Sequence, residues 1–221
     1  MPDTTDAPWT TADLVAIDLE GSGPQDPAGE AILEIALVPI RSGAPDIDNA
    51  YTTVINPERP IRRGPWISPG LTSSVLAAAP PLASVAPEIA ERVAGRVLVG
   101  HNVGVDWRLL RKRVPDARPA GLLDTLRLAK AHRPDLKKGH SLSDWIKRLD
   151  LTDTITAAAP GSQPHRALWD TVAAGQLLAA LATDTPDTQP SLAVLLAAGG
   201  IPLGDAPAPK PDDQQTLWDS L

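Results

Sequence analysis

Two acids stand at the end of the first apolar run of the chain. Residues 14–23 read LVAIDLEGSG, and the acids are Asp18 and Glu20. Side chains at positions i and i+2 of a strand point to the same face, so these carboxylates come close together with like charge. Removing such a pair from water is costly unless a cation or a proton compensates for the charge. The spacing therefore indicates a cation site, against the simpler alternative of strand-end acids paired with arginine or backbone groups.

Two further carboxylates stand where other elements could converge on this strand. Asp106 follows an apolar run in HNVGVDWRLL, and Asp170 lies near the start of a long apolar helix in HRALWD. Oxygen ligands in a chain without cysteine favour Mg²⁺ or Mn²⁺. Two such ions would balance four negative charges, and paired divalent ions are typical of sites that cleave phosphodiesters by in-line displacement.

Hydrolysis at such a site also needs a group that accepts a proton from water. His165 lies five residues before Asp170, and its reference pKa of about 6.5 suits a general base at neutral pH. Pro164 disfavours helical geometry at the residue before it, so a helix should begin near residue 165. We therefore expect His165 on the loop that enters this helix, although a lone histidine there would be interpreted as a surface residue.

Elements that could position these residues follow from the apolar patterns. Three β-rich runs with short, turn-rich connections suggest an antiparallel meander, after which strands alternate with helices in α/β form. Helical spacing is found in five later segments. The expected strands are 14–19, 31–40, 51–57, 96–102 and 121–125, and the expected helices are 83–95, 105–114, 125–133, 141–149 and 167–182.

Length and composition fit one domain followed by a tail. The chain has 221 residues, of which 43% are hydrophobic and 21% charged. We place a catalytic domain at residues 12–183, followed by a linker, a short helix and a flexible tail at residues 184–221. No targeting segment or long apolar run is found, which predicts a cytoplasmic protein with no membrane partner.

The charge of the chain is negative overall but unevenly distributed. The net charge of −7 argues at first against a nucleic-acid partner, yet 12 of the 20 Lys and Arg residues lie between Arg108 and Arg148. A basic flank beside an acidic site would suit a polyanionic substrate. Arg108, Arg111, Lys112 and Arg113 either contact phosphates or coat a helix, and the sequence leaves both readings open.

Three ordered motifs resemble those of a known family. IDLEGSG resembles its first motif, DxE, HNVGVDWRLL its second, HNxxxDxxxL, and HRALWD its third, HxAxxD. Together they are similar to the DEDDh, or DnaQ-like, group of 3′→5′ exonucleases over about residues 12–182. The resemblance implies a ribonuclease H-like α/β fold with a five-stranded mixed sheet flanked by helices. The sister group with tyrosine in place of the histidine needs YxxxD, which the single tyrosine, Tyr51, does not provide.

The same resemblance implies roles for the site residues. Asp18, Glu20, Asp106 and Asp170 would hold two Mg²⁺ or Mn²⁺ ions, and His165 would be the general base that helps release 5′-mononucleotides from a 3′ end. Gly21 and Ser22 would contact the terminal nucleotide. Here the chain departs from its relatives, because Gly-Ser-Gly follows the glutamate where many carry Thr-Thr-Gly or Ala-Thr-Gly. Base or sugar preference is therefore open.

Four neighbours of the motif acids are expected to be structural. Trp107 and Trp169 each adjoin a site acid, and we assign them to the core ahead of a base-stacking role. His101 and Asn102 are expected to satisfy backbone groups at the end of a strand.

A second short motif ends the chain, in DDQQTLWDSL. Gln214, Leu217 and Trp218 on a Pro-rich tether resemble the pentapeptide with which bacterial replication and repair proteins bind the sliding clamp. The alternatives are a disordered tail or one that folds back on its own domain.

The sequence thus predicts a metal-dependent 3′→5′ exonuclease that acts on single-stranded or frayed 3′ ends, with DNA favoured, in proofreading or repair. The alternatives are an exoribonuclease and a non-catalytic module that binds nucleic-acid ends or the clamp.

Overall fold

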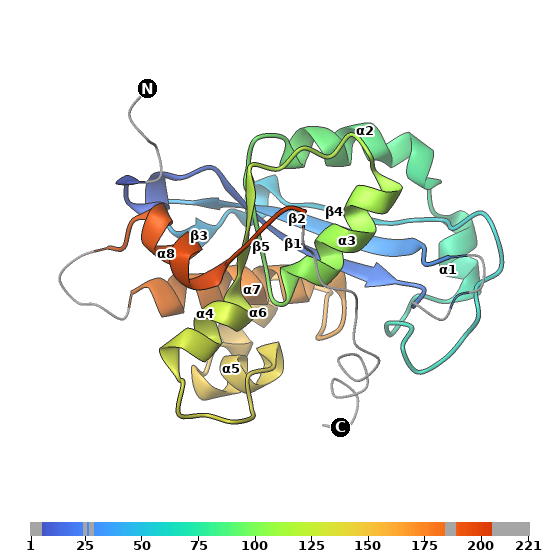
Figure 1. Cartoon of the computed structure of the whole chain (residues 1–221). Coiled ribbons are helices and arrows are strands. Elements are labelled where there is room, and N and C mark those ends of the chain that lie inside the picture. The colour runs from blue at the N-terminus through green and yellow to red at the C-terminus, as the bar shows by residue number, and fades with distance from the viewer. Residues whose placement is uncertain (1–5, 24–25, 27–28, 184–188, 205–221) are drawn as a thin grey trace.

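A mixed sheet forms the centre of the molecule, with helices on both faces (Figure 1). The computed structural model describes residues 6–23, 26, 29–183 and 189–204. Within these residues the sheet has seven strands. They are β1 (Leu14–Gly21), β2 (Ile32–Arg41), β3 (Ala44–Pro45), β4 (Tyr51–Val54), β5 (Val97–Gly100), β6 (Gly121–Asp124) and β7 (Gly200–Ile201).

The strand order is β3-β2-β1-β5-β6-β7, and β4 also pairs with β2. β1 runs antiparallel to β2 and parallel to β5, and β5 runs parallel to β6. All five expected strands are present, but the predicted total of five is wrong. The two additional strands, β3 and β7, have two residues each, and such short strands carry no alternation that a sequence could reveal.

Eight α-helices and two 3-10 helices are found in the described residues. They are η2 (Trp9–Thr11), η3 (Ile47–Asn49), α1 (Ser73–Ala78), α2 (Leu82–Val93), α3 (Val103–Arg113), α4 (Thr125–His132), α5 (Leu142–Arg148), α6 (Thr152–Ala158), α7 (Ala167–Ala182) and α8 (Leu192–Gly199). Of these, no helix is long and apolar enough to cross a membrane.

Separate apolar cores lie on the two faces of the sheet, and β1 contributes alternate residues to each. Leu14 and Ala16 belong to the core that contains the buried face of α7, whereas Val15 and Ile17 belong to the core that contains α2 and α3. Because strand side chains alternate with a period of two, the acids that follow at positions 18 and 20 continue the α7 face. The hydrophobic pattern of β1 thus turns both carboxylates toward α7.

The folded unit extends beyond both expected boundaries. We expected it to begin at residue 12, yet Trp9 is 2% exposed and belongs to the core on the α7 face. We expected it to end at residue 183, yet Leu192 and Leu195 of α8 are buried in the same core. The chain forms a short helix there, α8, and the apolar face of this helix packs on the domain.

Hydrogen bonds fasten this C-terminal segment at several points. The Trp9 backbone N–H donates to the Pro190 carbonyl over 3.1 Å. β7 pairs antiparallel with β6, and the Trp107 indole N–H donates to the Leu203 carbonyl over 2.8 Å. Residues 189–204 therefore belong to the domain, although their helix is separated from the main pattern by a turn-rich stretch that resembles a linker in sequence.

Candidate active site

Three carboxylates from two elements converge at the end of β1. Asp18 and Glu20 of β1 and Asp170 of α7 offer ligand oxygens that all lie within 4.8 Å of one another. Asp170 lies one turn into α7, on the helix that packs against β1. The structure thus brings together three of the four predicted metal ligands, drawn from the first and third motifs.

The fourth predicted ligand, Asp106, approaches from the other side of β1. It lies in the first turn of α3 and is 8% exposed. Its Oδ1 accepts a hydrogen bond of 2.9 Å from the backbone N–H of Leu19, the residue between the two β1 acids. Asp106 does not belong to the group of three within 4.8 Å, but its charge acts on Asp18.

Burial raises the pKa of every one of these acids. Burial is the largest cause of the raised pKa of Asp18, and the charges of Glu20 and Asp106 add to it. The pKa of Glu20 is raised to about 8, that of Asp106 to about 8 and that of Asp170 to about 7, each chiefly by burial. Four acids that resist ionisation together are the expected property of a site completed by cations.

A serine that the sequence analysis did not single out holds one of the predicted ligands. The Ser68 hydroxyl donates a short hydrogen bond to Oε2 of Glu20, and Ser68 is 4% exposed. This bond lowers the pKa of Glu20 and so opposes the effect of burial. Ser68 lies in the Pro-rich connection between β4 and α1, where no periodic pattern marks a residue as buried.

His165 lies where the sequence placed it, on the loop before α7. Its φ of 65° is left-handed, and Arg166 is the N-cap residue of the helix. The His165 backbone N–H donates to the Asp170 carboxylate, and partial burial lowers the pKa of the imidazole. The base candidate and a ligand candidate are therefore joined through the backbone.

A fifth carboxylate, Glu34, borders the site. It lies on β2 opposite Glu20 in the strand register and is 4% exposed. Arg166 donates to it through Nε over 2.8 Å and through Nη2 over 2.6 Å. Sequence reasoning missed this pair, although one acid inside the apolar run AILEIALV was a signal that could have revealed it.

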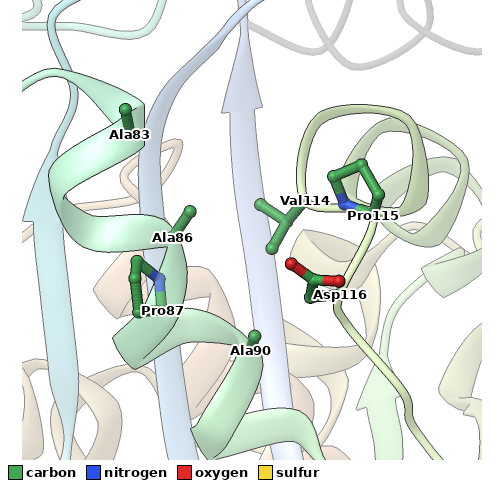
Figure 2. Close-up of a pocket in the computed structure, with 7 residues that line it drawn as sticks. All are labelled: Ala83, Ala86, Pro87, Ala90, Val114, Pro115 and Asp116. Atoms are coloured by element: carbon green, nitrogen blue, oxygen red, sulfur yellow. The ribbon is translucent and has the colours of Figure 1, made fainter.

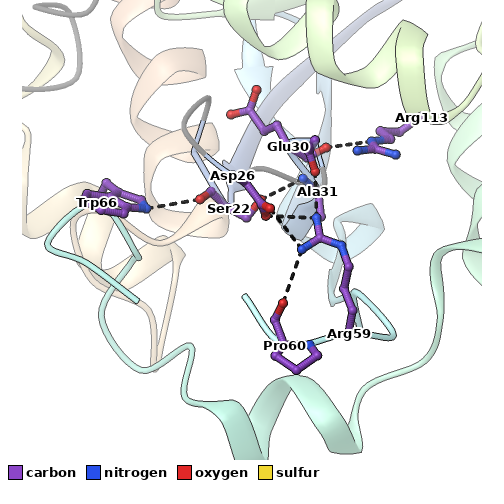
Figure 3. Close-up of polar contacts among 9 residues, drawn as sticks. Ser22, Asp26, Glu30, Ala31, Arg59, Pro60, Trp66 and Arg113 are labelled. Carbon is purple, nitrogen blue, oxygen red and sulfur yellow. Dashed lines mark hydrogen bonds and ion pairs between the residues drawn. The ribbon is translucent and has the colours of Figure 1, made fainter. Parts of the chain in front are cut away.

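The turn after Glu20 is built into the protein interior (Figure 3). Ser22 is 1% exposed, its hydroxyl accepts from the Ala31 N–H over 2.8 Å, and its carbonyl accepts from the Trp66 indole over 3.1 Å. A Cβ on Gly21 would lie 2.8 Å from Oε1 of Glu30, so only glycine fits there without a shift of that side chain. The Ser22 side chain therefore has a structural role in this geometry, and substrate contact by Gly21 and Ser22 stays a prediction.

Three of the four residues assigned to structural roles are confirmed in them, whereas the Asn102 side chain makes no capping bond at the start of α3. Trp107 and Trp169 are 7% and 3% exposed. The two ring nitrogens of His101 lie 3.0 Å from Oγ1 of Thr125 and 2.9 Å from the His140 carbonyl, and burial lowers the His101 pKa to about 4. This histidine is an uncharged support between strand and loop.

Basic residues of α3 mostly bind the protein itself. Arg108 forms an ion pair of 2.6 Å with Glu30, and Nε of Arg113 donates to the Glu30 carbonyl over 2.7 Å, a contact also drawn in Figure 3. Arg111 donates to the carbonyls of Leu203 and Gly204. These contacts give the three arginines a role that neither reading named, the support of neighbouring loops, and phosphate contact by this helix stays a prediction.

One apolar pocket lies away from the acids. It has a volume of about 270 Å³ between α2 and the turn that follows α3, and none of the site acids lines it (Figure 2). The predicted clamp-binding residues Gln214, Leu217 and Trp218 lie outside the described residues.

Comparison with known families and proteins gives a consistent match. A family model described as exonuclease matches residues 15–178. The chain is 31% identical over 174 residues to a DNA polymerase III subunit epsilon-like protein of Rhodobacter capsulatus, covering 77% of this chain and 24% of that protein. It is 28% identical over 178 residues to the PolC-type DNA polymerase III of Bacillus subtilis, covering 78% of this chain and 12% of the relative. The chain thus spans a quarter or less of the length of these relatives.

Solved structures agree on the fold. A full-length 3′-exonuclease superposes with a TM-score of 0.61 at 13% identity, over 82% of this chain and 63% of the other. Exonuclease I of E. coli in a complex with single-stranded DNA gives a TM-score of 0.59 at 17% identity, over 80% of this chain and 41% of the other. The predicted ribonuclease H-like α/β class is confirmed, with the strand count corrected as above.

Proposed function

The chain belongs to the exonuclease family whose model matches residues 15–178, and from this we propose that it is a metal-dependent 3′→5′ exonuclease. It would hydrolyse phosphodiester bonds at the 3′ ends of single-stranded or frayed nucleic acid and release 5′-mononucleotides. The observation that carries the proposal is the convergence of Asp18, Glu20 and Asp170 within 4.8 Å, with Asp106 hydrogen-bonded to the same strand.

The residues present fit two divalent cations. Electrostatic repulsion links five carboxylates at the site, those of Asp18, Glu20, Asp106, Asp170 and Glu34. Arg166 forms an ion pair with one of them, Glu34. With all of them ionised, five carboxylates and one guanidinium leave four negative charges, which two Mg²⁺ or Mn²⁺ ions would neutralise. All four proposed ligands are carboxylates, the type that these ions prefer. When bound, such ions supply charge stabilisation at a phosphodiester.

His165 suits the role of general base. Because partial burial lowers the pKa of its imidazole, the ring is neutral and able to accept a proton at neutral pH. Its backbone bond to Asp170 keeps it at the edge of the acidic cluster. Gly21 and Ser22 are proposed to meet the terminal nucleotide. Since Ser22 is buried, and its hydroxyl, backbone N–H and carbonyl already bond to Ala31 and Trp66, the half-buried Gly21 would make most of that contact.

We favour DNA as the substrate because of the names of the similar proteins. The matched proteins include DNA polymerase III polypeptides, and the superposed E. coli exonuclease I was solved with single-stranded DNA. Proofreading or repair is the corresponding role. RNA is the alternative, and location in the cytoplasm stays a prediction.

The test uses 5′-labelled single-stranded DNA and RNA oligomers of matched sequence, with Mg²⁺, Mn²⁺ or EDTA. We expect metal-dependent ladders that shorten from the 3′ end, with 5′-mononucleotides as the product and faster cleavage of DNA. Asp18→Asn and Asp170→Asn should abolish cleavage while circular dichroism shows a retained fold.

Other outcomes separate the alternatives. Faster cleavage of RNA would make the protein an exoribonuclease. Tight binding of oligomers with no cleavage in any metal would overturn the enzyme proposal in favour of a module that binds nucleic-acid ends.

The clamp contact is a separate proposal on the terminal motif. Pull-down of a bacterial sliding clamp by the full chain should be lost in the Leu217→Ala/Trp218→Ala variant. Equal capture by both proteins would dismiss the motif and leave the exonuclease proposal untouched.

A further inference from the structure

The partly buried pair of Glu34 and Arg166 connects the central sheet to the start of α7. Both oxygens of Glu34 are used, because Oε2 accepts from Nε of Arg166 over 2.8 Å and Oε1 accepts from Nη2 over 2.6 Å. Oε2 also accepts from the Ala167 backbone N–H over 3.2 Å. A carboxylate from β2 therefore satisfies one of the free N–H groups at the start of α7, where the N-cap side chain makes no capping bond.

The residue next to this pair has a strained backbone. His165 has a φ of 65°, a left-handed conformation that is unfavourable for a residue other than glycine and persists only where the surroundings enforce it. Two attachments flank it, since its own N–H binds Asp170 and the following residue is fixed to Glu34. On the other side of the guanidinium, Nη1 of Arg166 lies 3.1 Å from where a Cβ on Gly70 would be, so Gly70 packs closely against this partly exposed side chain.

We infer that Glu34 and Arg166 are positioning residues that hold the His165 imidazole in its working orientation relative to the four acids. The inference rests on the proposed function, in which His165 is the general base. Glu34 is not a metal ligand here, because both of its oxygens are occupied by Arg166 and Ala167. The bidentate fork fixes a direction as well as a distance, which a single point charge does not.

The test is the double variant Glu34→Gln/Arg166→Gln. It removes one negative and one positive charge together, so the net charge of the site is unchanged and no buried charge is left without its partner. We expect kcat to fall by about 10- to 100-fold, because small misplacements of a catalytic group have effects of this size. The KM for the oligonucleotide and the Mn²⁺ affinity measured by calorimetry should change by less than about threefold.

A measurement without metal or substrate examines the same geometry. The chain has four histidines, so their imidazole Cε1–H resonances are few enough to resolve by NMR, and His165→Ala identifies one of them. In the metal-free double variant the His165 resonance should shift, whereas those of His101, His132 and His140 should stay in place. An unchanged His165 resonance together with an unchanged kcat would overturn the inference.

Control variants keep the outcome interpretable. Asp46→Asn/Arg41→Gln removes an exposed ion pair from the far end of β2 and should leave kcat and the His165 resonance as in the wild type. If the double variant at positions 34 and 166 unfolds, Arg166→Lys replaces it. That variant retains the charge without the fork and should still lower kcat, so wild-type kcat in it would contradict the inference. Failure of the proposed function would show differently, as a wild-type protein without metal-dependent cleavage.

Discussion

The carboxylate of Asp106 accepts a hydrogen bond of 2.9 Å from the backbone N–H of Leu19, the residue between Asp18 and Glu20. A side chain from α3 is thereby bound to the strand that carries the first two acids. Because this bond uses Oδ1, Oδ2 of Asp106 is the oxygen that remains for a second contact. The second motif is thus held in position before any ion binds.

Asp106→Asn should separate folding from activity. The amide oxygen can still accept from Leu19, while one buried acid with a pKa of about 8 is removed. We expect nucleotide release to fall by about 100-fold or more, since a proposed metal ligand loses its charge. The melting temperature in EDTA at about pH 8.5 should equal or exceed that of the wild type. A variant with wild-type activity would remove Asp106 from the ligand set.

Ser68→Ala should weaken metal binding through Glu20. The hydroxyl donates to the ionised form of that carboxylate and lowers its pKa, so its loss favours the protonated form. We expect the Mg²⁺ concentration for half-maximal activity to rise by about 10-fold, with a smaller change in kcat at saturating Mg²⁺.

A serine on α2 provides the matched control for this change. The Ser84 hydroxyl is exposed and donates to the Pro81 carbonyl at the start of its own helix. Ser84→Ala should leave the Mg²⁺ dependence unchanged. An identical Mg²⁺ response in Ser68→Ala would show that the hydroxyl does not act on metal binding.

Stability of the metal-free protein should fall as the pH rises. Folding raises the pKa of Glu20 and Asp106 to about 8 and that of Asp170 to about 7, from ordinary values near 4. Between about pH 4 and pH 8 the folded chain therefore binds more protons than the unfolded chain, and the free energy of unfolding decreases with pH. In EDTA the melting temperature should be several degrees lower at about pH 8.5 than at about pH 6.

Divalent cations should reduce this pH dependence. They bind the ionised carboxylates, which are most abundant at high pH, so saturating Mg²⁺ should raise the melting temperature more at about pH 8.5 than at about pH 6. An equal Mg²⁺ effect at both values would argue that the ions bind elsewhere.

Leu195→Ala should show that α8 belongs to the folded unit. Leu195 is 6% exposed, and its truncation should lower the free energy of unfolding by about 2 to 4 kcal/mol in denaturant titration. Val194, on the same helix, is 58% exposed, so Val194→Ala should change stability by less than about 0.5 kcal/mol. Equal stability of the two variants would mean that α8 is detached in solution.

Period-two and period-3.6 patterns predicted most of the fold, because they report which face of an element is buried. β1 is the clearest case, since alternation through Val15 and Ile17 also fixed the face shared by Asp18 and Glu20. The patterns failed for β3, which depends on a tight turn at Ser42 and Gly43, both with positive φ. They also failed to show that Trp9 and α8 are buried in the core, because that burial depends on contacts between distant parts of the chain.

The four site acids and His165 could be predicted from the sequence, because metal ligands and general bases are restricted to a few residue types and these stand at fixed spacings. Ser68 could not be found this way, since a serine in a loop gains its role from the one carboxylate it meets. Arg166 adjoins the predicted base at the start of α7, yet its partner Glu34 lies on the distant strand β2. Pairing between β1 and β2 determines that contact, and the register of that pairing was not part of the sequence pattern.

The attachment of Trp9 to Pro190 also has a kinetic consequence. The backbone bonds from Trp9 to Pro190 and from Leu192 to Ala7 join residues near the two ends of the described chain. During synthesis, residue 9 leaves the ribosome long before residue 190. The apolar surface of the Trp9 side chain therefore stays exposed until the segment around Pro190 has been made. Contacts between residues so far apart in the sequence slow folding, and we expect the pairing of residues 7–9 with residues 190–192 to be a late step.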